Sequence, residues 1–135
     1  EVMIAREGLE LKLTNPIFMS DFYMEDRKQE DVVLMALSGR FGAHAIEQFR
    51  NQLTHSLQVH QTTKIILQLE ELSDLTMAGI RALVDARRTV ASLALVGIPD
   101  DVYRVMELAG TTDFFPIYDS VYEAIVAMNN HHGNE

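Results

Sequence analysis

Apolar and polar positions near the start of the chain predict a β-hairpin. Residues 17–25 form an extended stretch that leads into the polar run 26–31, and residues 32–37 are apolar at every position. A strand that is apolar throughout is typical of the interior of a sheet, whereas a polar run between two strands is typical of a turn. The pattern therefore predicts a hairpin whose second strand is buried and ends at Ser38-Gly39.

Downstream of Gly42 the pattern alternates between amphipathic helices and short apolar strands. The helical periodicity covers residues 46–57, 77–90, 99–109 and 120–128, and the apolar strands cover residues 65–69 and 93–98. Ser120 and Glu123 have the spacing of a capping box at the start of the last helix. Strands that are separated by helices run parallel, because each crossover returns the chain to the same end of the sheet.

The expected fold is a single small α/β domain. Its mixed sheet starts with the antiparallel hairpin, and its central strands are parallel and joined by crossover helices. The inward apolar positions predict the core: Val32, Leu34, Ala36, Phe49, Ile65, Leu67, Ile80, Leu83, Leu95, Val105 and Ile125.

Composition narrows the classes of function. The 135 residues carry a formal net charge of −9 and no cysteine, so disulfides and thiolate metal sites are excluded. The negative charge disfavours nucleic acid and anionic membrane surfaces as partners. The longest apolar runs, residues 65–67 and 93–96, are far shorter than the roughly 20 residues of a membrane span. We therefore expect a soluble, cytoplasmic protein that does not insert into membranes.

Motifs for catalysis are missing from the sequence. There is no glycine-rich phosphate loop and no HExxH zinc motif. Ser38 and Ser73 lack an elbow motif or an adjacent base, and the carboxylate pairs at 70–71 and 100–101 do not face each other on regular elements. The histidines are interpreted as surface, half-buried or tail residues. We predict no enzyme, no cofactor and no metal site.

Several segments in their order along the chain resemble the STAS domain family, which includes the bacterial anti-sigma-factor antagonists and domains at the ends of sulfate transporters. These segments are residues 37–42, 65–72, 75–83, 102–110 and 115–120. The resemblance covers about residues 20–128, and its most specific part is the stretch 94–124. It implies a STAS-like α/β fold and a regulatory module that binds a protein partner.

The resemblance also directs attention to one loop. In that family the loop after the second parallel strand carries Asp-Ser-Ser-Gly, and a partner kinase that doubles as the anti-sigma factor phosphorylates one serine. With Gly79 as anchor, this chain has Thr76-Met77-Ala78-Gly79, so neither serine position carries a hydroxyl. A second acid of the family pattern falls on Gly42. The resemblance therefore predicts a partner-binding site made of these five residues that is not controlled by the usual serine phosphorylation.

Alternatives remain at this stage. The replaced residues also fit simple drift within the family, with recognition by other surfaces. Thr76 is the nearest remaining hydroxyl, and a two-residue shift of register would make residues 74–76 the phosphorylated loop. The partner is expected to be a kinase-type anti-sigma factor or a transporter component. The alternative function is a STAS domain that binds a small anion or lipid, or that serves as an accessory subunit of a transporter.

The chain divides into a STAS-like domain, residues 17–128, and two flanking segments. Residues 1–16 form an N-terminal extension with leucine at every second position between 9 and 13, as expected of an extra edge strand or of an arm exchanged in a homodimer. Residues 129–135 are expected to be a flexible polar tail. The connection from helix to strand, Ala91-Ser92, is shorter than is usual in the family. Either this short connection is long enough to join the two elements, or a segment is missing from the sequence here.

Overall fold

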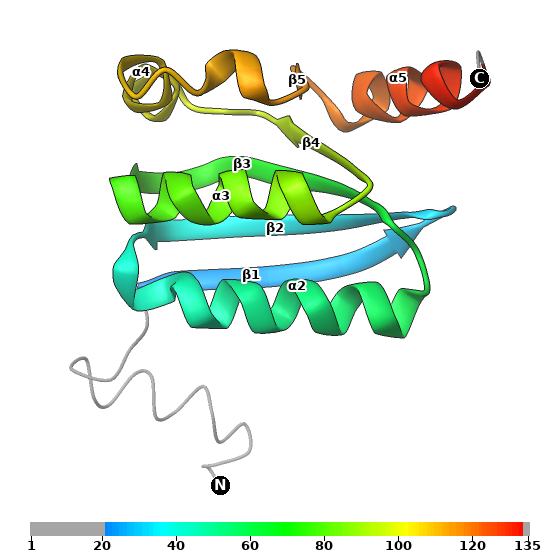
Figure 1. Cartoon of the computed structure of the whole chain (residues 1–135), viewed down its shortest axis with the longest axis horizontal. Coiled ribbons are helices and arrows are strands. Elements are labelled where there is room, and N and C mark those ends of the chain that lie inside the picture. Colours follow the sequence, from blue (N-terminus) through cyan, green and yellow to red (C-terminus); the bar gives the residue numbers. More distant parts are fainter. Residues whose placement is uncertain (1–20, 134–135) are drawn as a thin grey trace, which may run out of the picture.

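The computed structural model describes residues 21–133, which form a five-stranded sheet with helices on both faces (Figure 1). The elements are β1 (Phe22–Gln29), β2 (Val32–Phe41), η1 (Ala43–Ala45), α2 (Ile46–His60), β3 (Lys64–Leu75), α3 (Met77–Thr89), β4 (Ser92–Val96), α4 (Asp100–Leu108), η2 (Thr112–Phe114), β5 (Ile117–Tyr118) and α5 (Val121–Gly133). The strand order is β1-β2-β3-β4-β5, with β1 antiparallel to β2 and the other pairs parallel. This confirms the predicted fold class. The N-terminal extension, residues 1–16, lies outside the described residues.

The hairpin is longer than the sequence pattern indicated. The polar run 26–31 was expected to be the turn, and this is wrong for its first four residues, which continue β1 up to Gln29 opposite Val32. An edge strand tolerates polar side chains, since its flank stays open to water. The predicted end at Ser38-Gly39 is also wrong. Irregular register around these residues lets β2 continue to Phe41, and the φ of +92° at Gly39 suits a glycine.

Buried side chains form one cluster on each face of the sheet. The larger cluster joins the sheet to α2, α3 and α4. At its centre lie Phe22, Phe41 and Phe49. The ring centroids of Phe22 and Phe41 are 4.9 Å apart, and so are those of Phe41 and Phe49. The smaller cluster packs Ala124 of α5 against β2, β3 and β4. The helices therefore hold the sheet from both sides.

Most of the predicted core is buried, with three exceptions. The buried members are Val32, Leu34, Phe49, Ile65, Leu67, Ile80, Leu83 and Leu95. Ala36, Val105 and Ile125 were expected in the core but are half-buried. Ala36 borders a hollow lined by Tyr23 and Gln68, where no helix covers the sheet face, and the other two lie at the margins of their clusters.

Strand β3 runs well beyond the predicted residues 65–69 and ends only at Leu75. Its parallel pairing with β4, for example Ile65 opposite Leu93, agrees with the prediction. The connection before β4 consists of Val90 and Ala91, one residue earlier than the predicted Ala91-Ser92, and the Ser92 N–H donates to the Thr63 carbonyl over 3.1 Å. The predicted end of this strand at residue 98 is wrong, since β4 ends at Val96.

The last helix starts with the predicted cap. The Glu123 N–H donates to the Ser120 hydroxyl over 3.1 Å. The Glu123 carboxylate accepts from the Asp119 N–H at 3.3 Å, one residue earlier than in the standard box. α5 then continues to Gly133, beyond the boundary drawn at residue 128.

A polar cluster ties β1 to α2. Asp26 accepts hydrogen bonds from Ser56 at 2.6 Å and Gln52 at 3.2 Å, and His60 Nε2 lies 3.3 Å from the same carboxylate. Ser56 is fully buried, so Asp26 satisfies a hydroxyl that has no access to water. The Ser56 hydrogen bond is the main cause that lowers the pKa of Asp26; partial burial opposes it, and Gln52 and His60 add to the lowering.

Replacing Asp26 by alanine is expected to lower the free energy of unfolding by about 2 kcal/mol at pH 7, because Ser56 is left without an acceptor. The lowered pKa means that the carboxylate stabilises the fold above its ordinary pKa of 3.8, and that this contribution is lost as the pH falls through the folded pKa. Urea unfolding at pH 7 and at pH 3 checks both points. The matched variant Asp31→Ala removes an exposed ion pair with Lys64 and should cost no more than about 0.5 kcal/mol. Equal losses in the two variants would contradict the prediction.

Candidate functional site

Two loops leave the sheet side by side at the carboxyl ends of β2 and β3. The strands are parallel, and their last residues, Phe41 and Leu75, are partners in the register. The chain then enters η1 after Gly42 and α3 after Thr76. The carboxyl edge of parallel strands is where α/β domains commonly place their binding surfaces. The predicted site residues Gly42 and Thr76 are thus brought together from positions 34 residues apart.

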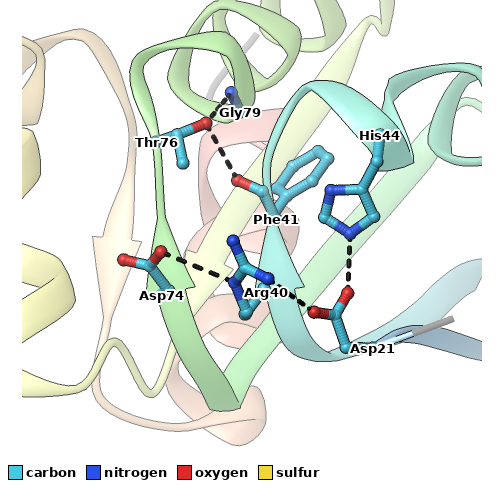
Figure 2. Close-up of polar contacts among 7 residues, drawn as sticks. All are labelled: Asp21, Arg40, Phe41, His44, Asp74, Thr76 and Gly79. Carbon is cyan, nitrogen blue, oxygen red and sulfur yellow. Dashed lines mark hydrogen bonds and ion pairs between the residues drawn. The ribbon is translucent and has the colours of Figure 1, made fainter. Parts of the chain in front are cut away.

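Thr76 caps α3 and links the two loops (Figure 2). Its Oγ1 accepts a hydrogen bond from the Gly79 N–H at 3.3 Å and donates to the Phe41 carbonyl at 3.4 Å. The Thr76 N–H also donates to that carbonyl, over 3.1 Å. A side-chain acceptor at this position satisfies one of the amides that a helix start leaves unpaired. The hydroxyl of Thr76 is therefore already engaged in holding the loop.

Glycine is required at position 79, where the two loops meet. A Cβ placed on Gly79 would lie 2.3 Å from the Phe41 carbonyl oxygen and 2.9 Å from Cδ1 of Leu75. A Cβ on Gly42 would lie 3.2 Å from both Oγ1 and Cγ2 of Thr76. A side chain at position 42, such as the acid of the family pattern, would therefore contact Thr76. Gly79 lets the backbone of the two loops approach closely, and Gly42 leaves room for the side chain of Thr76.

The first turn of α3 presents an apolar side chain to solvent. Met77 is 57% exposed, whereas Ala78 is half-buried and Gly79 is buried. No acidic residue lies in this first turn, so the positive end of the helix dipole is not compensated by a carboxylate there. The site thus combines an exposed methionine with an uncharged helix start.

Charged side chains form a rim beside the loops (Figure 2). Asp21 accepts a hydrogen bond from Arg40 at 2.8 Å and lies 2.7 Å from Nε2 of His44, and Arg40 Nε lies 4.0 Å from Asp74. Partial removal from water raises the pKa of Asp21, but the hydrogen bonds with Arg40 and then His44 outweigh this effect and hold the pKa below its usual value. The rim therefore has paired charges of both signs around the uncharged loop.

Sequence reasoning identified the loops but missed this rim. Asp21 and His44 are 23 residues apart, and only the hairpin register, with Phe22 opposite Gly39, brings them together. The signal that could have been used is the pair Arg40 and His44 on either side of Gly42, at the turn from strand to helix. The sequence analysis interprets His44 only as a surface or half-buried histidine and assigns no role to Arg40.

No group of three or more His, Asp or Glu side chains in residues 21–133 is placed to hold a metal ion. No helix between Asp21 and Gly133 combines the length and the apolar character that crossing a bilayer requires.

The fold and the site together define a small α/β domain whose distinguishing surface is a pair of linked loops at the carboxyl ends of two parallel strands. The chain belongs to the STAS domain family: the family model matches residues 23–124, most of the chain. This confirms the resemblance seen in the sequence.

Individual relatives agree with this assignment. The chain is 22% identical over 109 residues to an anti-sigma F factor antagonist of Paenibacillus polymyxa, covering 78% of this chain and 93% of the relative. The crystal structure of an anti-sigma factor antagonist from Mycobacterium paratuberculosis superposes with a TM-score of 0.69 at 15% identity, covering 78% of this chain and 92% of the other. The murine anion transporter Slc26a9 contains a similar domain, with a TM-score of 0.66 at 18% identity over 77% of this chain and 18% of the transporter. At such identities the structural likeness shows a shared fold.

Proposed function

We propose that the protein is a non-catalytic regulatory module of the anti-sigma-factor antagonist type, which acts in the cytoplasm by binding a protein partner. The family and the antagonists among its relatives support a regulatory protein-binding role. The contact surface in this proposal is formed around Gly42 and the segment from Thr76 to Gly79; the two glycines are themselves buried and shape the loops, whereas Met77 presents the exposed side chain. The partner is a kinase-type anti-sigma factor.

The observation that carries this proposal is the exposed Met77 at the start of α3. A large apolar side chain that is 57% exposed contributes little to its own domain, but it can be buried by a partner. The neighbouring backbone is held by Thr76 and Phe41, so the side chain is presented on a fixed support. Exposure together with a rigid support is what an anchor residue requires.

We also propose that binding is not switched by serine phosphorylation. The two positions that precede Gly79 are Met77 and Ala78, which carry no hydroxyl. Thr76 is poorly placed to accept a phosphoryl group, because its Oγ1 already caps α3. A phosphate on this atom would break the hydrogen bonds to Gly79 and Phe41. The shifted register is disfavoured as well, since Asp74 and Leu75 belong to β3. Binding is therefore constitutive or controlled by other means.

The test is complex formation with a purified kinase-type anti-sigma factor from the same organism, in the presence of ATP and Mg²⁺. Calorimetry should report a complex, and intact-mass measurement should find no phosphate on this chain. Phosphate mapped to Thr76 would contradict the constitutive proposal, and absence of a complex with every such kinase of the organism would contradict the partner class.

Introducing a serine is expected to restore a phosphate acceptor. Met77→Ser places a hydroxyl in the exposed first turn of α3, next to amides and a helix dipole that favour a phosphate. We expect the variant to bind the partner more weakly than the unmodified protein, because it lacks the methionine contact, but to gain about 80 Da, the mass of one phosphoryl group, when it is incubated with kinase and ATP. Ala78→Ser, at a half-buried position, tests the other family serine. Failure of both variants to accept phosphate would show that this loop does not reach the kinase active site.

A second candidate function follows from the likeness to the transporter domain. In that case the chain would be an accessory subunit of a transporter, or would bind a small anion or lipid beside the start of α3. Native mass spectrometry of the purified protein discriminates between the two candidate functions. A retained small molecule favours the ligand-binding alternative, and a stable complex with the kinase-type anti-sigma factor favours the antagonist.

A further inference from the structure

A cavity lies at the opposite end of α3 from Met77, between α5 and the beginning of β4. Its volume is about 290 Å³. The residues that line it come from the last turns of α3, the connection to β4, β4 itself, β5 with the residue before it, and the middle of α5: Arg87, Ala91, Ser92, Leu93, Ala94, Pro116, Tyr118, Ala127 and Met128. The cavity shares no residue with the partner-binding surface, so the two can be tested independently.

Among the side chains that the structure describes, Arg87 is the only charged one in the lining. The chain as a whole carries a net charge of −9, yet none of the described carboxylates lines this cavity. The Nε atom of Arg87 is buried and has no hydrogen-bond partner. A buried donor on a charged group that lacks a partner costs stability, and native proteins rarely leave one unsatisfied. An anionic acceptor in the cavity would satisfy it.

The rest of the lining is mixed in character. Leu93, Pro116 and Met128 are apolar, whereas Ser92 and Tyr118 add hydroxyl groups that can donate to an anion. Strand β5 pairs with β4 only at Leu95 and Val96, so it does not cover the edge of β4 before Leu95. The cavity occupies this uncovered stretch.

We propose that the cavity binds a small monocarboxylate with a short aliphatic tail. The carboxylate would pair with Arg87, since guanidinium groups match carboxylates in geometry and charge. The tail would lie against Leu93 and Met128. The volume is at the lower end of the range for small-molecule sites, so the site takes a ligand of about six to eight carbons and is too small for a two-chain lipid.

The test is a titration of the full ¹⁵N-labelled chain with hexanoate, followed by NMR. Hexan-1-ol, which has the same tail without the charge, is the neutral control. We expect saturable shifts at the backbone amides of Ser92, Leu93 and Met128, with a Kd below about 1 mM, and at least tenfold weaker binding of the alcohol. Absence of saturable shifts up to about 20 mM, or equal binding of acid and alcohol, would overturn the proposal.

Matched variants identify the charged group. Arg87→Gln is expected to weaken hexanoate binding at least about tenfold. Arg88→Gln should leave it unchanged, because Arg88 lies over the Phe114 ring, 5.8 Å from its centroid, and does not line the cavity. Ala127→Leu fills the space and should abolish binding, which keeps the test decisive if Arg87→Gln does not fold. Equal effects of the two arginine variants, or unchanged binding by folded Ala127→Leu, would refute the site.

Discussion

Replacing Gly79 by alanine is expected to lower the free energy of unfolding by about 3 kcal/mol, although a glycine-to-alanine change usually favours a helix. The added Cβ would lie 2.3 Å from the Phe41 carbonyl oxygen, so the loop after β2 or the first turn of α3 must move. Either movement also breaks the hydrogen bonds that Thr76 makes to both loops. Thermal unfolding should show a decrease in Tm of about 10 °C for a chain of this size.

Gly110→Ala provides the control for this prediction. Gly110 has a φ of +72°, but no other atom of the described residues lies within 4 Å of a Cβ built there. This substitution should lower the free energy of unfolding only by the penalty of an alanine at positive φ, about 1 kcal/mol. A Gly79→Ala variant no less stable than Gly110→Ala would show that the two loops do not pack as described.

Replacing Met77 by aspartate is expected to abolish partner binding while the protein keeps its stability. An exposed methionine that buries about 100 Å² against a partner contributes up to roughly 2–3 kcal/mol of contact energy. A carboxylate in its place would be stranded in the interface, and a buried unpaired charge costs several kcal/mol more. We expect the Kd to increase at least about 100-fold. The Tm should stay constant or rise slightly, because an acid in the first turn of a helix favours the helix dipole.

Tyr122→Asp is the matched control for the effect of charge. Tyr122 is 76% exposed and also lies in the first turn of a helix, but that helix, α5, packs on the opposite face of the sheet. This variant should bind the partner as the unmodified protein does, within about twofold. Retained binding by Met77→Asp, or a large decrease in its Tm, would show that the loop is not the interface.

Hydrophobic periodicity predicted the α-helices and two of the three strands after Gly42, but not the two-residue strand β5. The stretches 65–69 and 93–96 lie inside the sheet and are apolar except for the half-buried Gln68, so their pattern is easy to recognise. The same reasoning failed for residues 26–29, whose polar side chains belong to an edge strand. Asp26 is satisfied by Ser56 on α2, 30 residues later in the chain, and such a contact leaves no local signal.

The candidate site could also be predicted only in part. The loop could be located because Gly79 anchors it within the family resemblance, although residues 76–78 depart from the family pattern. The charged rim could not be predicted, since it depends on the hairpin register that brings Asp21 to Arg40 and His44. The cavity beside Arg87 exists because β5 begins to pair with β4 only at Leu95, and periodicity does not determine where a two-residue strand begins.

The shared acceptor at Phe41 has a consequence for the thermodynamics of recognition. One carbonyl holds both the backbone and the side chain of Thr76, so the loops after β2 and β3 are preorganised as a single unit. When a partner docks on either loop, little conformational entropy is lost in ordering the other loop. Affinity differences among variants of this surface should consequently appear in the rate of dissociation, while the rate of association stays nearly constant.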